Sequence, residues 1–343
     1  MPVNTSRTTY REHTDTENIL KLRQVLSTLP AFCKDYFRAI DSTTTTKTRI
    51  SYAYDIRIFF QFLLDENPAF KNYAMTDFSV AVLDQIKAVD LEEYMEYLKV
   101  YQNGDKTETN GERGLKRKIS ALRSFYAYYY KREMIHTNPT VLIDVPKIHD
   151  KSIIRLDTDE VALLLDYIEH CGDSLTGQKR VYYEKTKERD LAIVTLLLGT
   201  GIRVSECVGL DIEDVDFKNN GIKVTRKGGN EMVVYFGEEV EKALKRYLEI
   251  REGITPLAGH EHALFYSAQR KRMGVQAVEN MVKKYSRQIT TTKKITPHKL
   301  RSTYGTALYQ ETGDIYLVAD VLGHKDVNTT KKHYAALDDA RRR

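Results

Sequence analysis

The segment 136–150 constrains the fold most, because it separates two stretches of regular helical pattern. It reads HTNPTVLIDVPKIHD and carries Pro139 and Pro146 with little apolar periodicity. Proline disfavours helix at its own position and at the residue before it. We therefore interpret residues 136–152 as a linker between two domains. A chain of 343 residues is long enough for both.

The part before the linker is expected to be all helical. Apolar residues recur with helical spacing in several segments, and a polar run, QNGDKTETNG, is interpreted as a loop between the last two. We expect an N-terminal extension over residues 1–30 and a helical domain over residues 31–135. The helices are predicted at 15–28, 47–65, 90–102 and 112–133.

The part after the linker has a mixed pattern. Two β-rich runs, GIKVTRK and NEMVVYF, lie on either side of Gly228-Gly229 and predict a hairpin. Residues 153–343 are therefore expected to form an α+β domain, and the whole chain to be mainly α with a small antiparallel β-sheet. Helices are predicted at 157–171, 188–199, 238–251, 275–288, 298–311 and 314–322.

The composition excludes several classes of protein. Hydrophobic residues make up 41% and charged residues 29%, which is typical of a soluble globular chain. No apolar run is long enough to cross a bilayer, and the N-terminus lacks the apolar core of a secretory signal. Cys33, Cys171 and Cys207 lie far apart, so neither a disulfide framework nor a thiolate metal site is expected. We expect a cytoplasmic protein without membrane association.

Positive charge is concentrated in two regions. Residues 270–343 contain 16 Lys and Arg against 7 Asp and Glu, although the net charge of the whole chain is only +5. Two separated basic regions suit a polyanion gripped from two sides, but solvated helix faces explain the charge equally well. The second region, 112–133, contains Arg113, Lys116, Arg117, Lys118, Arg123, Lys131 and Arg132 against Glu112 and Glu133.

Arginine and lysine stand at two turns of the second domain. Arg203 follows an apolar helix in TGIRVSE, where its guanidinium could fork two hydrogen bonds to a phosphate. A surface arginine paired with Glu206 would give the same pattern. Lys227 stands at the predicted hairpin tip, where a mobile proton donor and a solvated turn lysine are both consistent with the sequence.

Two histidine motifs follow. His298 and Arg301, in HKLR, share a helix face at i, i+3 spacing, and follow a helix-start signal, Thr296-Pro297. This pair suits an oxyanion rather than a metal, because arginine has no lone pair to offer. His324 lies in LGHK with Gly323 as a candidate helix cap, and Tyr334 follows ten residues later. Each of these residues alone is also consistent with a structural role, and a single tyrosine is more often a packing residue than a nucleophile.

Together these residues change the interpretation. Their order and approximate spacing resemble the tyrosine recombinase (phage integrase) family, and the chain looks Xer-like. TGIRVSE, the hairpin lysine, HKLR, LGH and the terminal tyrosine carry the resemblance, and KISALRSFYAYYYKREMIHTNP resembles the last core-binding helix and linker. The resemblance covers roughly residues 45–335. It implies a DNA-clamping core-binding domain followed by a catalytic domain, and the catalytic set Arg203, Lys227, His298, Arg301, His324 and Tyr334.

The resemblance also implies a mechanism. Arg203, Arg301 and His324 would hold the scissile phosphate, and His298 would assist. Lys227 would protonate the leaving 5′ oxygen, and Tyr334 would carry the 3′ phosphate covalently. Glu206 would position an arginine or the neighbouring turn without touching the DNA. Neither cofactor nor metal is expected, because no phosphate-binding GxxxxGK[ST] loop or convincing carboxylate cluster occurs, and His260-Glu-His262 is interpreted as a solvent loop.

The implied partner is double-stranded DNA with a specific recombination site, bound by a homo-tetramer. Whether accessory proteins take part stays open, as does the choice between chromosome-dimer resolution and mobile-element integration. Two rival functions remain: a type IB topoisomerase-like enzyme, and a DNA-binding protein of the same fold that does not cleave. Candidate phosphate contacts in the first domain are Thr46, Lys47, Arg49, Arg113, Arg117 and Arg123.

Overall fold

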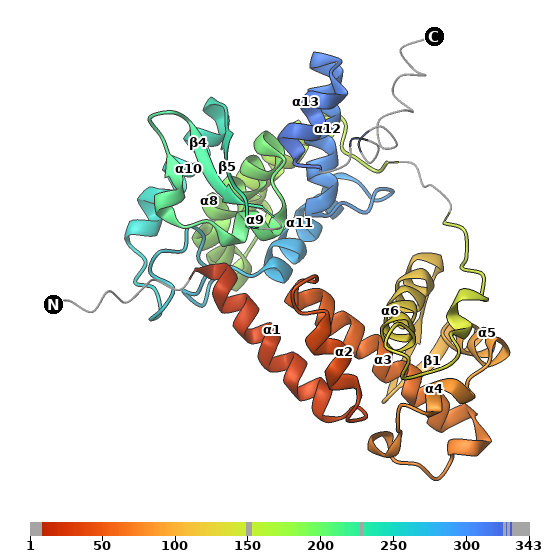
Figure 1. Cartoon of the computed structure of the whole chain (residues 1–343). Helices are drawn as coiled ribbons and strands as arrows, with labels where there is room; N and C mark the ends of the chain where they lie inside the picture. The colour runs from red at the N-terminus through yellow and green to blue at the C-terminus, as the bar shows by residue number, and fades with distance from the viewer. Residues whose placement is uncertain (1–8, 149–152, 227–228, 325–326, 328–329, 331–343) are drawn as a thin grey trace. The chain divides into compact units, whose positions relative to one another are not determined.

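The chain forms two compact units that divide between Asp150 and Lys151. The structure, a computed structural model, describes residues 9–148, 153–226, 229–324, 327 and 330 (Figure 1). Lys227 and Tyr334 of the expected catalytic set lie outside these residues. Within the described residues, no helix is both long enough and apolar enough to span a membrane.

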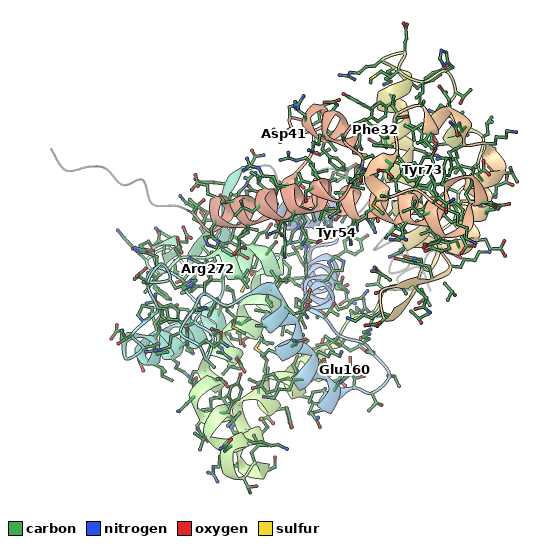
Figure 2. All side chains as sticks on the ribbon, turned by 90° about the horizontal axis from the view of Figure 1, so that it is seen from below. Phe32, Asp41, Tyr54, Tyr73, Glu160 and Arg272 are labelled. Atoms are coloured by element: carbon green, nitrogen blue, oxygen red, sulfur yellow. The ribbon has the colours of Figure 1, made fainter. Side chains whose placement is uncertain are left out.

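The first unit is built on the long helices α3 (Thr46–Glu66) and α6 (Glu112–Tyr130). Its core is unusually aromatic. Phe32, labelled in Figure 2, packs edge-on against Phe60 and Tyr129, with ring centroids 6.0 and 5.4 Å away. Such edge-to-face pairs add to the free energy of burial. The remaining elements are α1 (Tyr10–Ser27), α2 (Cys33–Ala39), η1 (Pro68–Phe70), η2 (Met75–Asp77), α4 (Val82–Gln85), α5 (Ala88–Tyr97), β1 (Val100–Asn103), β2 (Lys106–Thr109) and η3 (Pro139–Val141).

The two ends of the first unit differ from expectation. Helix α1 packs on α3, and Leu22 and Val25 are buried in the common core, so the described part of the expected extension belongs to the unit. The start of the expected linker is also packed, because Thr140 and Ile143 are buried. The division between the units nevertheless falls within the segment 136–152.

One element was predicted wrongly. The helix expected over 90–102 ends at Tyr97, and the expected polar loop forms the antiparallel hairpin β1–β2. Gly104 and Asp105 join the strands, and Gly104 has a left-handed φ of +61°. A two-residue hairpin turn requires such a conformation, which glycine adopts without strain.

The second unit is arranged around α8 (Gly177–Thr200), which contacts α7, α10 and α12. Residues 191–197 of α8 are buried, as the apolar segment 188–199 predicted, and its more polar first half is mostly exposed apart from Tyr183 and Thr186. A three-stranded antiparallel sheet in the order β3-β4-β5 contains the expected hairpin. The other elements are α7 (Thr158–His170), η4 (Cys171–Ser174), α9 (Val204–Gly209), η5 (Ile212–Asp214), β3 (Val215–Asp216), β4 (Gly221–Thr225), β5 (Glu231–Tyr235), α10 (Glu238–Glu252), α11 (Val275–Ile289), α12 (Pro297–Thr312) and α13 (Ile315–Leu322).

Glycines end three helices of this unit in the left-handed conformation. Gly201, Gly313 and Gly323 follow α8, α12 and α13, with φ of 61°, 69° and 60°. Each glycine stops the helix and turns the chain sharply. Arg203 follows the first glycine by two residues, and His324 follows the last directly. All three cysteines of the chain are free and buried.

Candidate active site

Arg203 caps the start of α9 and is held by Glu206. The Glu206 carboxylate accepts hydrogen bonds from the backbone N–H of Arg203, at 2.7 Å, and from its Nη1, at 2.8 Å. The Glu206 side chain is 5% exposed, whereas that of Arg203 is 34% exposed. The expected Arg203–Glu206 pair therefore exists. The buried Glu206 carboxylate holds the Arg203 guanidinium in place, and part of the guanidinium remains accessible to solvent.

Arg301 is buried in α12 and joins the ends of two other helices. Its Nη1 donates a hydrogen bond to the carbonyl of Gly201, after α8, and its Nη2 donates to that of Leu322, in α13. Figure 1 shows α12 and α13 side by side, as their contacts require. Arg301 thus fixes the relative positions of the turn that carries Arg203 and the turn that carries His324.

Three arginines converge on the C-terminal end of α13. Arg226 donates from Nη1 to the carbonyl of Asp320, at 3.2 Å, and from Nη2 to that of Val321, at 2.6 Å. Arg203 Nη2 donates to the Gly323 carbonyl at 3.3 Å, and Arg301 to that of Leu322. The last carbonyls of a helix lack partners within it and carry partial negative charge, which cationic side chains offset. We call Arg203, Arg226 and Arg301 the arginine cluster.

His324 lies directly beside this cluster. Its backbone N–H donates to the carbonyl of Ala319 at 2.9 Å, which closes the C-terminal turn of α13. Its ring Nδ1 lies 2.8 Å from the hydroxyl oxygen of Thr330, a fully buried residue. A bond at Nδ1 fixes the ring orientation and leaves Nε2 as the atom on the opposite side of the imidazole.

The remaining catalytic candidates are His298, which the structure describes, and Lys227 and Tyr334, which lie outside the described residues. His298 is exposed in the first turn of α12, one turn before Arg301, as the i, i+3 spacing predicted. Lys227 is undescribed, but its neighbours are placed. The Arg226 backbone N–H donates to the Asn230 carbonyl at 2.8 Å, and the Gly229 N–H donates to the Arg226 carbonyl at 2.9 Å. Tyr334 lies beyond Thr330, the last described residue.

The electrostatics of the cluster suit an anion. Burial lowers the pKa of the Arg226 guanidinium; the nearby Glu206 charge opposes this, and the Arg203 charge adds to it. The three guanidinium groups of the cluster outnumber the two carboxylates that act on it, those of Glu206 and Asp320, so the surplus charge is positive. Planar guanidinium groups pair well with phosphate oxygens. The described residues include no His, Cys, Asp and Glu group suited to a metal, and His262 pairs with Glu213 at 2.6 Å.

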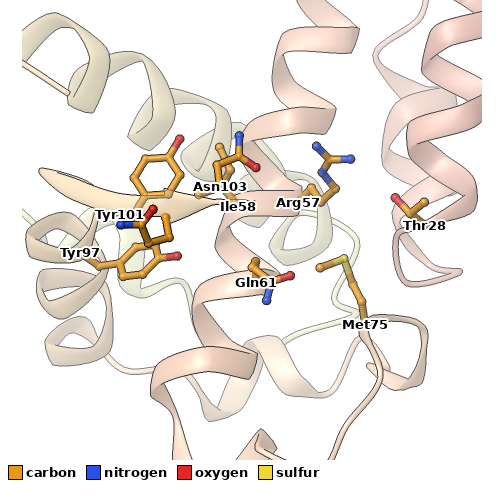
Figure 3. Close-up of a pocket in the computed structure, with 9 residues that line it drawn as sticks. Thr28, Arg57, Ile58, Gln61, Met75, Tyr97, Tyr101 and Asn103 are labelled. Atoms are coloured by element: carbon orange, nitrogen blue, oxygen red, sulfur yellow. The ribbon is translucent and has the colours of Figure 1, made fainter. Parts of the chain in front are cut away.

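The pocket shown in Figure 3 is a different feature. It has a volume of about 440 Å³ and lies in the first unit, where its lining includes Arg57 and Gln61 of α3 and also Tyr97 and Tyr101. Its lining includes no residue of the expected catalytic set. The arginine cluster is instead a set of donors spread over helix ends and a hairpin.

The DNA-contact candidates of the first unit fall into two groups. Lys47 and Arg113 are exposed, as is Arg117, which nevertheless bonds within the protein. The others bond within the protein: Thr46 donates to Asp15, Arg49 pairs with Asp41, Arg117 pairs with Asp55, and Arg123 donates to the carbonyls of Thr140 and Ile143. All six remain predictions, and the geometry favours Lys47 and Arg113. Arg226 was not singled out in the sequence, where its only signal is its place before Lys227.

Comparisons with known proteins show the family of the chain. A model of the phage integrase family matches residues 155–341. The tyrosine recombinase XerC of Caldanaerobacter subterraneus subsp. tengcongensis is 33% identical over 317 residues, which covers 90% of this chain and 83% of that protein. The tyrosine recombinase XerS of Lactococcus lactis subsp. cremoris is 30% identical over 340 residues, which covers 92% of this chain and 93% of that protein.

Solved structures show the same fold. The integrase of transposon Tn1549, in complex with circular intermediate DNA, has a TM-score of 0.63 and 21% identity, covering 88% of this chain and 94% of that one. The XerH site-specific recombinase bound to its difH substrate has a TM-score of 0.59 and 21% identity, covering 86% and 78%.

Proposed function

This chain belongs to the phage integrase family as a Xer-like tyrosine recombinase, and from that premise we propose that Tyr334 cleaves DNA whose scissile phosphate is held by Arg203, Arg301 and His324. The enzyme acts by site-specific tyrosine recombination, in which DNA is cut and rejoined. The observation that carries the residue assignments is the convergence of Arg203, Arg301 and His324 at the end of α13. Three separate sequence motifs supply these side chains.

The chemistry assigned to this site is a substitution at phosphorus. The Tyr334 oxygen attacks the scissile phosphate, and the bond from phosphorus to the 5′ oxygen breaks. His298 takes the phenolic proton, and Lys227 gives a proton to the leaving 5′ oxygen. The resulting 3′-phosphotyrosyl bond retains the energy needed for a 5′ hydroxyl to rejoin the strand. No external energy source is required.

Arg203 and Arg301 supply the main stabilisation in this scheme. Attack builds negative charge on the non-bridging phosphate oxygens, and preorganised donors aimed at that charge lower the barrier. Removing one such donor costs about 10²–10³ in rate. Glu206 supports this role, because its buried carboxylate holds Arg203 in place through two hydrogen bonds. A lysine in place of either arginine would lose the planar fork.

The proposed partner is double-stranded DNA. Two of the similar solved structures are recombinases or integrases bound to DNA, which supports this choice. Exposed Lys47 and Arg113 are the proposed phosphate contacts in the first unit. Exchange of strands between two duplexes requires several protomers, and we propose a homo-tetramer assembled on DNA.

A suicide duplex tests the nucleophile. The duplex carries a nick close to the cleavage site, so that a short fragment diffuses away and the covalent complex accumulates. Wild-type protein is expected to give a denaturant-resistant protein–DNA band, and Tyr334→Phe is expected to give none because it lacks the phenolic oxygen. Tyr235→Phe, at a tyrosine that is 69% exposed in the same unit, is the matched control and should retain the band. A band from Tyr334→Phe would refute the assignment.

A further inference from the structure

Arg226 is anchored at both its backbone and its side chain. Its backbone bonds to Gly229 and Asn230 hold the described ends of the β4–β5 connection together, at 2.9 and 2.8 Å. Its guanidinium leaves the hairpin and forks onto two consecutive carbonyls, those of Asp320 and Val321. These bonds join positions 94 and 95 residues apart in the chain. The hairpin end is thereby fixed to the end of α13.

The packing around Arg226 shows how close this approach is. A Cβ atom built on Gly323 would lie 1.4 Å from the Arg226 Nη1, so any side chain there would displace the guanidinium. Gly323 also has a φ of +60°, which residues other than glycine rarely adopt. The glycine is therefore needed for two reasons: it forms the left-handed turn after α13, and it leaves room for the Arg226 guanidinium.

The same helix end carries the donors assigned to the phosphate. Arg301 holds the Leu322 carbonyl and Arg203 holds that of Gly323, the two positions that follow those held by Arg226. Four consecutive carbonyls thus set the spacing between the hairpin and the proposed phosphate ligands. Lys227 is the next residue after Arg226 in the chain. Fixing Arg226 therefore restricts the positions that the Lys227 ammonium can reach.

We propose that Arg226 is a positioning residue, which holds the β4–β5 hairpin against α13 so that Lys227 can protonate the leaving 5′ oxygen. The proposal rests on the proposed function, in which the bond from phosphorus to the 5′ oxygen breaks and the Lys227 ammonium supplies the proton. Arg226 itself acts through the backbone and does not touch the reacting atoms. A misplacement of about 1 Å at a reacting group can cost about 10²-fold in rate.

The test compares two leaving groups in single-turnover cleavage. One suicide duplex has the ordinary phosphodiester, and the other has sulfur in place of the 5′ bridging oxygen at the scissile position. A thiol is far more acidic than an alcohol, so the sulfur leaves without a proton donor. Arg226→Ala is expected to slow cleavage of the oxygen duplex by about 10²-fold and to leave cleavage of the sulfur duplex near the wild-type rate. Lys227→Ala should show the same selective rescue.

Two further variants separate positioning from stability. Arg251→Ala removes an arginine of the same unit that also bonds to backbone carbonyls, those of Ala263 and Leu264, but touches neither the hairpin nor α13. It should affect both duplexes equally. Arg226→Lys keeps the charge but offers no planar fork, so it should fall between wild type and Arg226→Ala on the oxygen duplex alone.

The outcomes distinguish the possible failures. An equal loss on both duplexes in Arg226→Ala, or no loss on either, would overturn the positioning role. If Lys227→Ala is not rescued by sulfur, the general-acid assignment is wrong and the proposal falls with it. If wild-type protein forms no covalent product with either duplex, the proposed function itself fails.

Discussion

A single carboxylate, Asp55, holds two cationic side chains inside the first unit. Its side chain is 2% exposed and accepts hydrogen bonds from Lys118 Nζ at 3.2 Å and Arg117 Nη2 at 2.8 Å. The Lys118 side chain is only 6% exposed, so its ammonium depends on this partner. A buried charge that loses its counterion destabilises a fold strongly.

Asp55→Ala is therefore expected to lower the free energy of unfolding by about 3–5 kcal/mol. Asp35→Ala is the control, because the Asp35–Arg38 pair is exposed at 48% and 80% and should contribute at most about 1 kcal/mol. Urea unfolding followed by circular dichroism measures both values. Equal losses in the two variants would show that Asp55 has no special structural role.

Single residues also show where sequence reasoning stopped. The motifs located Arg203, Arg301 and His324 because each has a local context that can be read from neighbouring residues. Arg226 was missed because its partners, Asp320 and Val321, lie far along the chain. Arg123 was predicted as a DNA contact from charge alone, which could not reveal that its guanidinium bonds to the carbonyls of Thr140 and Ile143.

At the scale of elements, periodicity located most helices but not their ends. The apolar segment 188–199 marks only the second half of α8, since the first half buries only Tyr183 and Thr186, too few to give an apolar stripe. The error over 90–102 arose because tyrosines continue the helical spacing past Tyr97, while Gly104 favours a hairpin turn. Backbone pairing between β1 and β2 outweighed the helical pattern.

Gly323, at the end of α13, has a matched control in Gly177, the first residue of α8. Gly323 and Gly177 both have positive φ, 60° and 57°, but only Gly323 has a neighbour in the way. Gly177→Ala is expected to cost about 1–2 kcal/mol from backbone strain alone. Gly323→Ala should cost more and also reduce covalent-complex formation, because Arg226 must move. Thermal unfolding and the suicide duplex measure the two effects, and identical behaviour would contradict the close approach.

The turn after α6 depends on another carboxylate. Asp84 accepts hydrogen bonds from the backbone N–H groups of His136 and Thr137, at 2.7 and 2.9 Å. Burial raises its pKa, but hydrogen bonds from the His136 ring and from these N–H groups outweigh burial, so the pKa lies below the ordinary value of 3.8. Because the pKa of Asp84 is lower in the folded state, the charged carboxylate stabilises the fold at pH values above the ordinary pKa.

Asp84→Asn is expected to lower the free energy of unfolding by about 1–2 kcal/mol at pH 7. The stabilisation is present above the unfolded pKa and is lost as pH falls through the depressed folded value. The difference between wild type and variant should therefore persist at pH 5 and shrink toward pH 3. Urea unfolding at the three pH values checks this, and a constant difference would exclude the carboxylate charge as its cause.

At the scale of the molecule, charge predicts salt-dependent binding to DNA. Each neutralised phosphate releases counterions, so the affinity falls as salt rises. Arg113→Ala is expected to reduce the slope of log affinity against log salt by about 1, because Arg113 is exposed. Arg123→Ala should leave the slope unchanged and lower stability instead. Fluorescence anisotropy with a labelled duplex measures the slope. A reduced slope in Arg123→Ala with an unchanged slope in Arg113→Ala would show that Arg123, and not Arg113, contacts a phosphate.

The structure divides into two units within the segment 136–152, which carries Pro139 and Pro146. Sequence alone did not show that α1 and the first part of that segment pack on the first unit, because such docking depends on apolar residues brought together only by folding. Leu22 and Val25 illustrate this, since their spacing indicates a helix but not its partner.

The burial of every cysteine has a practical outcome. Burial raises the pKa of the Cys207 thiol to about 12, and Cys33 and Cys171 are also buried. The native chain thus offers no reactive thiol, and a newly introduced one would take up a dye selectively. Cysteines at exposed Lys116 and Lys242 would place one fluorophore on each unit. Energy transfer between them would then report how the units rearrange when the enzyme meets a duplex.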